Sequence, residues 1–160
     1  MSMYREMRRA KQEISGEACR RVLEEARFGT LALSLEDGMP YAVPVSFAFD
    51  KESGALYFHG AAEGQKADAV RRDPRACFNI VSDPQQEEGQ WWREFDSVTV
   101  FGTLQKVEDL EEKETWLRRI GQRYYQDDAA VEEEIRQTLT RVLVLKLVPA
   151  HMTGKHVRER

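Results

Sequence analysis

Cysteine and histidine are scarce in this chain, and their scarcity excludes several classes of protein. Only two cysteines and three histidines occur among 160 residues. The histidines, His59, His151 and His156, show neither the H-x-x-x-H spacing nor the cysteine-rich spacing of a local metal site. Cys19 and Cys77 are more typical of buried thiols than of a disulfide in a cytosolic chain. We therefore expect no disulfide and no locally encoded metal site.

Long apolar runs and an excess of positive charge are also missing. No segment approaches the ~18 apolar residues of a membrane-spanning helix. The amino terminus, MSMYREMRRAK, is basic and polar and has no apolar core of a secretory signal. The net charge is −4, which gives no overall attraction to nucleic acid. We expect a cytoplasmic protein with no membrane partner and no nucleic-acid partner.

Two common catalytic motifs are absent. The chain contains no G-x-S-x-G and no G-x-G-x-x-G, which excludes a nucleophile elbow and a Rossmann nucleotide turn on motif grounds. Three carboxylates do occur together, at Glu132, Glu133 and Glu134. Consecutive residues of a helix point in different directions, so these carboxylates indicate a solvated face and not an acid–base pair.

The most informative segment that is present begins with a strand predicted over Tyr41–Phe49. Its alternation sorts side chains by size, since one face carries bulky residues (Tyr41, Val43, Val45, Phe47, Phe49) and the other carries small ones (Ala42, Pro44, Ser46, Ala48). The small face leaves room for a flat ligand or a partner subunit, although close packing of a helix on a sheet would give the same pattern. Pro44 has no N–H, which argues against a complete central ladder.

A second strand and a short helix follow. The pattern predicts a strand over Leu56–His59 and a helix over Gln65–Arg72, which Pro74 closes. Lys66 then lies in the first helical turn, where the helix dipole disfavours a cation. A bound anion would remove this conflict, because free backbone N–H groups and Lys66 would both favour it. The same lysine would otherwise be an ordinary solvated side chain at an exposed helix end.

The rest of the chain predicts further elements of a single domain over residues 1–160, with residues 1–14 as an amino-terminal arm. A helix begins at Gly16 after the cap Ser15 and ends at Gly29, and another begins at the capping box of Asp109 and Glu112. Four more strands are expected: Thr30–Leu35, Arg75–Ser82, Ser97–Val107 with a bulge at Gly102, and Val142–Val148. Six strands with short connections indicate a closed or nearly closed antiparallel barrel with inserted helices.

Several blocks, in one order along the chain, resemble a known family. They are YREMRRAK (4–11), the small-faced strand with its central proline, YFH (57–59), EGQK (63–66), DPRACF (73–78), SVTVFG (97–102) and HMTGK (151–155). Together they resemble the FMN-binding split-barrel proteins related to pyridoxamine 5'-phosphate oxidase, and most of all the branch of 5-nitroimidazole-resistance proteins. The resemblance implies a mainly β fold with inserted helices, a six-stranded antiparallel split β-barrel, and a homodimer whose flavin sites lie between the subunits.

The same resemblance implies FMN as the cofactor and names its contacts. The flavin ring would lie against Val43, Pro44, Val45 and Ser46, and the phosphate would meet Gly60, Gln65 and Lys66. His59, at the family's histidine position, would lie beside the flavin and orient a substrate or donate a proton. The implied reaction passes electrons from NADH or NADPH through the flavin to a small-molecule acceptor, a nitroaromatic in the resistance branch.

The loop Asp83–Arg93 carries two adjacent tryptophans, Trp91 and Trp92. Exposed aromatic pairs are usually covered by something, either a second subunit or a bound ring. Both interpretations hold together if the flavin lies between subunits, and Trp92 is therefore a candidate cofactor contact. Asp96 stands where relatives often carry a basic residue, so Arg93 would have to replace that phosphate contact.

Three alternatives stay open at this point. The protein could be a flavin-binding module without turnover that acts in storage or redox sensing. It could be a haem-binding split barrel in which His59 is an axial ligand. It could also handle pyridoxal phosphate or pyridoxamine phosphate, although the R-x-V-L-L-K substrate motif of full pyridoxamine-phosphate oxidases is missing.

Overall fold

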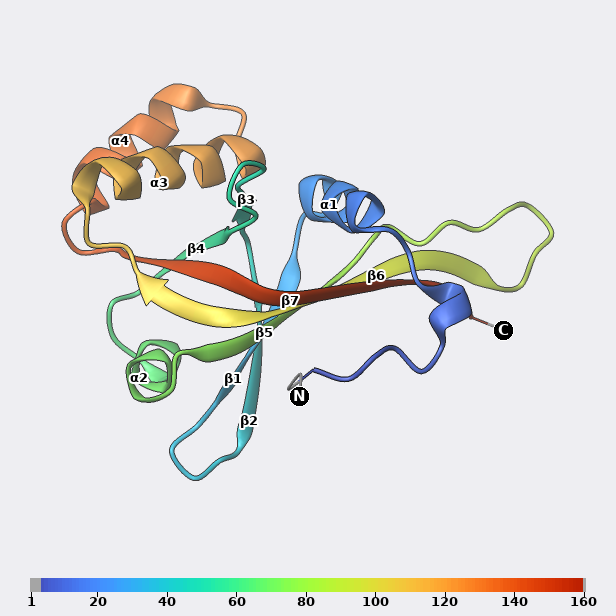
Figure 1. Ribbon diagram of the computed structural model, residues 1–160. Coiled ribbons are helices and arrows are strands. Elements are labelled where there is room, and N and C mark those ends of the chain that lie inside the picture. Colours follow the sequence, from blue (N-terminus) through green and yellow to red (C-terminus); the bar gives the residue numbers. More distant parts are fainter. Residues whose placement is uncertain (1–3, 160) are drawn as a thin grey trace.

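The computed structural model describes residues 4–159, and the strands among them form one antiparallel sheet (Figure 1). In chain order these are β1 (Gly29–Ser34), β2 (Pro40–Val45), β3 (Ala48–Phe49), β4 (Leu56–Gly60), β5 (Arg75–Val81), β6 (Arg93–Lys106) and β7 (Leu143–Glu159). Neighbours in space follow the order β2-β1-β5-β6-β7-β4-β3. The sheet curves into the expected split barrel with inserted helices, and the strand count within residues 4–159 is seven where six were expected.

The helices lie on the two sides of this curved sheet. They are a short 3-10 helix η1 (Ala10–Gln12), then α1 (Gly16–Glu25), α2 (Gln65–Arg72), α3 (Leu110–Tyr124) and α4 (Asp128–Thr138). The pair α3–α4 packs over β3 and β4, whereas α2 packs near β1 (Figure 1). Within residues 4–159, every helix is too short or too polar to cross a membrane.

The extra strand arises because the expected strand Tyr41–Phe49 is broken at Ser46 and Phe47. The prediction of one continuous strand is wrong: β2 ends at Val45, and β3 begins at Ala48. Tyr124, from the end of α3, holds the break. Its hydroxyl accepts a hydrogen bond from the Phe47 N–H at 3.1 Å and donates one to the Arg27 carbonyl. A side chain distant in sequence thus makes the bend that local alternation does not predict.

The boundaries of other elements also differ from expectation, and β6, expected from Ser97, begins at Arg93. Helix α1 ends at Glu25, so the prediction that Gly29 ends it is wrong. Gly29 instead begins β1, where a Cβ atom would lie 2.3 Å from the ring of Phe78, and this close approach requires glycine. Strand β7 runs to Glu159 and not to Val148, because the HMTGK block continues the ladder with β6. The predicted bulge at Gly102 is confirmed by a register shift between Phe101 and Gly102.

Two hydrophobic cores result, and β4 contributes to both. Leu56 and Phe58 point into the barrel core, together with Phe47 and Phe78. Tyr57 points the other way, into a second core beneath α3 and α4, where it stacks on Trp116 with ring centroids 3.8 Å apart. Since side chains alternate along a strand, His59 lies on the same side of β4 as Tyr57, facing the α3–α4 pair.

Candidate functional site

His59 and Ser46 meet where β4 ends and the β2–β3 break begins. His59 pairs with Val144 of β7, and its Nε2 lies 3.5 Å from Oγ of Ser46. The histidine ring is exposed, whereas Tyr57 and Phe58 before it are buried. The structure therefore brings together two of the predicted site residues, one at the end of β4 and one in the break between β2 and β3, and it leaves the imidazole accessible.

Lys66 approaches the same place from α2. A Cβ atom built on Gly60 would lie 2.6 Å from Nζ of Lys66, so the ammonium group rests against the glycine backbone. The lysine is half-buried, and desolvation lowers its pKa. Among residues 4–159, neither a hydrogen bond nor an ion pair engages its Nζ. A desolvated cation without a partner favours an anion at this point.

The start of α2 supplies further groups that suit an anion. Gly64 is the N-cap residue, with φ of 111°, and it has no side chain to accept from the first N–H groups of the helix. Gln65 follows as the first helical residue and is exposed. The backbone donors of this turn, the helix dipole and Lys66 all favour negative charge. The helix bounds match the prediction, Gln65–Arg72.

The positive charge of Lys66 also acts on His59. Burial among protein atoms, despite the exposed edge of the ring, is the main cause that lowers the pKa of His59, and repulsion by Lys66 adds to it. The imidazole is therefore neutral near pH 7, with one nitrogen that donates and one that accepts. A neutral imidazole can orient a polar substituent or exchange a proton with it.

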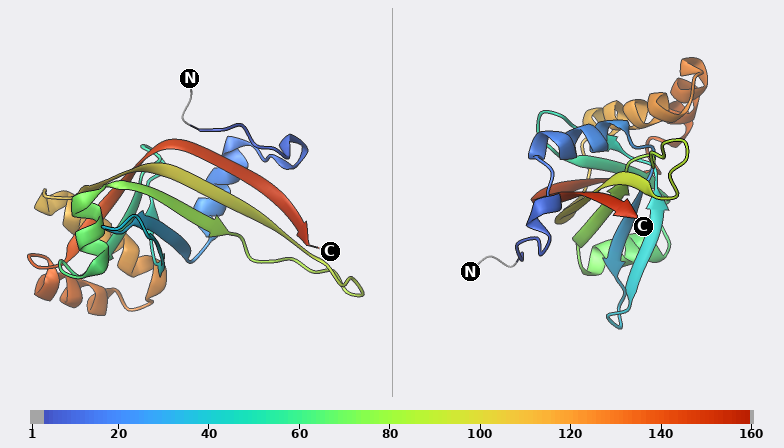
Figure 2. Two further views of the ribbon diagram at one scale, coloured as in Figure 1. Left: turned by 90° about the horizontal axis from the view of Figure 1, so that it is seen from below. Right: turned by 90° about the vertical axis from the view of Figure 1, so that its right-hand side faces the viewer.

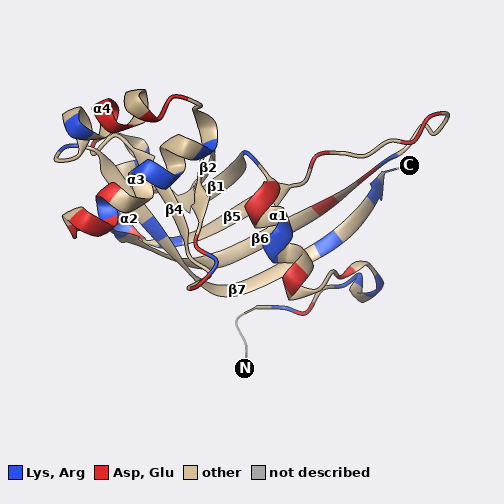
Figure 3. Cartoon of the chain, turned by 90° about the horizontal axis from the view of Figure 1, so that it is seen from above, with Lys and Arg blue, Asp and Glu red and all other residues tan. Residues whose placement is uncertain are grey.

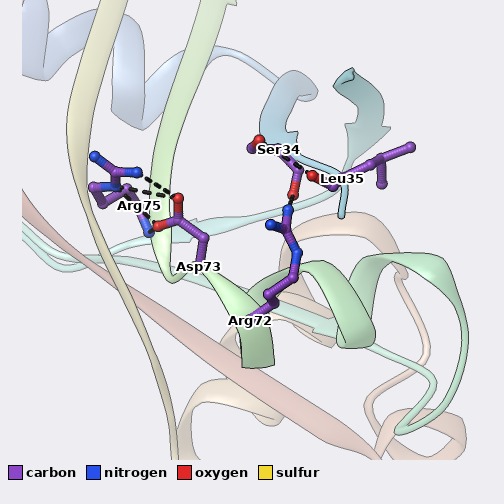
Figure 4. A network of polar contacts seen from close by, with 5 residues as sticks. All are labelled: Ser34, Leu35, Arg72, Asp73 and Arg75. Atoms are coloured by element: carbon purple, nitrogen blue, oxygen red, sulfur yellow. Dashed lines mark hydrogen bonds and ion pairs between the residues drawn. The ribbon is translucent and has the colours of Figure 1, made fainter. Parts of the chain in front are cut away.

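The DPR block fixes the far end of α2 and with it the direction of Lys66. Figure 4 shows Arg72 reaching the Ser34 carbonyl of β1, at 2.6 Å, while Asp73 holds Arg75 at the start of β5. The Arg75 guanidinium lowers the pKa of Asp73 to about 2. These residues tie the end of α2 to the end of β1 and to the start of β5. Their part in the site is therefore structural.

Strand β2 offers an exposed surface beside this centre. It is the first strand of the sheet order, so one side of its backbone has no ladder partner among the described strands, as Pro44 suggested. Ala42 and Pro44 are exposed, Val43 is half-buried, and Val45 belongs to the barrel core. Val45 could touch a ligand on the outer face through its backbone only, whereas Pro44 could present its ring.

A pocket of about 950 Å³ adjoins His59 on its other side. It lies between the segment His59–Glu63 and the helices α3 and α4, and most of its walls are apolar. The lining comprises His59, Gly60, Ala61, Ala62, Glu63, Leu117, Ile120, Gly121, Tyr125, Ala130, Val131, Glu134, Thr138, Arg141 and Val142. Sequence reasoning missed this pocket, because helical periodicity predicts which residues are buried but not where two helices leave space.

Trp92, Arg93 and Asp96 lie at the other end of the sheet. Gly60 pairs with Leu143 at the start of β7, whereas Arg93 pairs with Glu159 at its end, roughly 50 Å away along the strand at about 3.3 Å per residue. Figure 2 shows β6 and β7 running out to this end. Trp92 lies over the Arg158 guanidinium, and Asp96 contacts His156. One chain therefore does not bring Trp92 to His59 and Lys66.

Many solved structures are similar to most of this chain, and three of them serve as examples. A provisionally named 5-nitroimidazole antibiotic resistance protein from Bacteroides thetaiotaomicron shares 24% identity, with a TM-score of 0.74 over 91% of this chain and 87% of that one. A conserved hypothetical protein from Mycobacterium tuberculosis shares 22%, with a TM-score of 0.77 over 94% and 90%. An FAD- and haem-binding protein from Mycobacterium smegmatis shares 22%, with a TM-score of 0.71 over 91% and 72%.

These structural likenesses show the fold. The comparison with curated proteins found no match. The sequence profile of one family, described as pyridoxamine 5'-phosphate oxidase, matches residues 15–156, which is nearly the whole chain and includes every residue of the candidate site. The protein therefore belongs to the pyridoxamine 5'-phosphate oxidase family of split barrels.

Proposed function

We propose that this protein is an FMN-dependent oxidoreductase that passes electrons from NADH or NADPH to a small acceptor such as a nitroaromatic. The observation that carries the proposal is the ammonium group of Lys66, half-buried against Gly60, without an acceptor in the described chain and beside an accessible His59. The names of the similar structures add support, since one is a flavin-binding protein and another is a nitroimidazole-resistance protein.

The residues present fit a flavin phosphate and ring. Lys66 and the first N–H groups of α2 would hold the phosphate, with Gln65 beside them and Gly60 allowing close approach. The exposed small surface of Ala42 and Pro44, with the backbone of Val43, Val45 and Ser46, would support the ring. When bound, the flavin supplies the redox chemistry by accepting a hydride and passing electrons on.

The chain's own contribution to the reaction centres on His59. Its Nε2 faces Oγ of Ser46, and the neutral imidazole could relay a proton by giving one from one nitrogen to a substrate while the other nitrogen takes one up from solvent. Ser46 would fix the tautomer and the orientation of the ring. The α3–α4 pair borders a pocket on this side of β4, so a substrate could reach the accessible imidazole from there.

We further propose that the active form is a homodimer. The outer face of β2 is exposed in the single chain, and Trp92 could reach a flavin bound at Lys66 only from a second copy. Arg93 would then stand in for the basic residue that Asp96 replaces. FMN is favoured over FAD because the site has one cationic phosphate position and no second nucleotide fold.

The absorbance spectrum of the purified protein, with chromatography of the released cofactor, tests the cofactor. Flavin bands and released FMN are expected. Released FAD would show that the cofactor is FAD and not FMN. A haem Soret band would show that the protein binds haem and would favour His59 as its ligand. Steady-state oxidation of NADH or NADPH with a nitroaromatic acceptor tests turnover, and its absence with FMN bound would favour a redox-sensing module. Light scattering at micromolar concentration tests the homodimer.

A further inference from the structure

The pocket between β4 and the α3–α4 pair is a separate cavity from the proposed flavin cradle. Ser46, Lys66 and the residues of β2 do not line it, and it shares only His59 and Gly60 with that cradle. Its volume, about 950 Å³, is in the range of pockets that hold a small organic molecule. It is formed within one chain, so it needs no partner subunit.

The walls and the rim of this pocket differ in chemistry. Leu117, Ile120, Val131 and Val142 form apolar walls. Charged side chains of both signs, Glu63, Glu134 and Arg141, are exposed at the rim, and Figure 3 shows both signs distributed over α3 and α4. A charged group pushed between the apolar walls would lose its hydration without gaining a partner, whereas an apolar body would gain from leaving water.

One hydrogen-bonding side chain stands where the pocket meets the flavin cradle. His59 lines both sites, and its imidazole is accessible from the helical side because Gly60, Ala61 and Ala62 beside it are too small to cover it. A ligand in the pocket could therefore place one polar substituent against the imidazole. The remaining lining polar groups, Thr138 and the exposed Tyr125, belong to the α3–α4 side.

We propose that this pocket binds an uncharged, mainly apolar small molecule that directs one hydrogen-bonding substituent at His59. Apart from His59 and Gly60, the lining lies outside the proposed flavin cradle, so this inference goes beyond the proposed reaction and does not depend on it. A molecule held here would occupy the side of His59 that faces away from Lys66 and would control which partner the imidazole meets.

The test compares two dyes that differ by one charge. N-phenyl-1-naphthylamine is uncharged, and 8-anilinonaphthalene-1-sulfonate is nearly the same molecule with a sulfonate. Binding of each to the purified full-length protein is measured by equilibrium dialysis, with the flavin content of each sample recorded by absorbance. We expect saturable binding of one uncharged dye per chain, about tenfold tighter than the sulfonated dye. Equal affinity for both dyes would overturn the ligand class.

Two neighbouring alanines of α4 locate the binding. Ala130 lines the pocket, whereas Ala129 is exposed on the same helix and does not. Ala130→Trp should fill the cavity and weaken the uncharged dye by about tenfold or more, while Ala129→Trp should leave its affinity unchanged. If Ala130→Trp does not fold, Thr138→Trp is used in its place, because Thr138 lines the same pocket at the other end of α4. Equal effects of the two alanine variants would overturn the location.

The NMR signal of the His59 ring gives an independent readout. The uncharged dye should shift this signal in the wild-type protein and in Ala129→Trp, but not in Ala130→Trp. The His156 signal, from the far end of the sheet, should not move in any of the three proteins. A dye that binds without shifting the His59 signal would contradict the contact with the imidazole.

Discussion

The two ends of β7 carry similar residues in opposite electrostatic situations. At the start, His59 and Lys66 lie close together without a carboxylate partner among the described residues. At the end, His156 contacts Asp96 at 2.9 Å and Glu94 at 3.5 Å, and Arg158 also pairs with Glu94. Both ends place a histidine near a cation. Only at the near end do the histidine and the cation lack a carboxylate partner among the described residues.

This difference separates the candidate site from a structural network. Paired charges at the far end already satisfy one another, so a ligand would have to displace a carboxylate. At the near end, Lys66 is partly desolvated, burial and Lys66 together keep His59 neutral beside it, and the uncompensated ammonium group costs stability that a bound anion would restore. Unfavourable local electrostatics of this kind are typical of functional sites.

Substituting His59 and His156 one at a time should give the largest difference between the two ends of β7. His59→Gln should lower turnover of a nitroaromatic acceptor by about 10²-fold, the scale of a positioned proton donor, while the flavin stays bound. His156→Gln should leave turnover unchanged. Steady-state rates and flavin absorbance of both variants check this, and a His59 variant that turns over at the wild-type rate would refute the catalytic role.

Substituting one lysine at each end, Lys66 or Lys155, tests FMN binding in the same way, and the expected effect is somewhat smaller. Lys66→Ala removes a charge-assisted bond to the phosphate and should raise the FMN dissociation constant roughly 10- to 150-fold, which corresponds to about 1.5–3 kcal/mol. Lys155→Ala removes an exposed lysine at the far end of β7 and should leave that constant unchanged. Fluorescence titration with FMN measures both, and an unchanged constant in Lys66→Ala would show that the phosphate lies elsewhere.

The sequence predicted the near end well because its signals are local. The capping and closing residues of α2, the alternation of β4 and the histidine position lie within twenty residues of one another. The approach of Ser46 to His59 was not predictable, because Tyr124 makes the break between β2 and β3 from a position 77 residues away. The alternation of side chains predicts one strand over Tyr41–Phe49, whereas the hydrogen bond between Phe47 and Tyr124 accompanies its division into β2 and β3.

The far end and the pocket were predicted less well for related reasons. The tryptophan pair Trp91–Trp92 predicts a surface covered by a second subunit or a bound ring, but its distance from His59 depends on the length of β7 and on the pairing of β7 with β6, which no local pattern reports. Gly29 looked like a helix terminus because glycine has that role often, whereas the ring of Phe78 is what requires it. The pocket depends on how α3 and α4 pack, which amphipathic spacing leaves open.

Two adjacent tyrosines have different roles. The hydroxyl of Tyr124 holds the break between β2 and β3, whereas Tyr125 only lines the pocket beside α3 and α4. Tyr124→Phe removes the hydroxyl that joins Phe47 to Arg27 and should cost about 1–3 kcal/mol, because the N–H of the buried Phe47 loses its partner. The thermal midpoint should fall by a few degrees. Tyr125→Phe alters a hydroxyl of a side chain that is 67% exposed and should change stability by less than about 0.5 kcal/mol. Thermal unfolding of both variants checks this prediction.

The smallest expected effect is on the ionisation of His59. Repulsion by Lys66 contributes to the lowered pKa of His59, so Lys66→Gln should raise that pKa, while desolvation keeps it below about 6.5. Because the folded state then binds fewer protons than the unfolded state, His59 contributes a loss of stability as the pH falls below about 6.5, and Lys66→Gln should reduce this loss. NMR titration of the ring measures the shift, with Lys155→Gln as the control. An unchanged His59 titration in Lys66→Gln would mean that the two groups are not electrostatically coupled and that only burial sets the charge state of the imidazole.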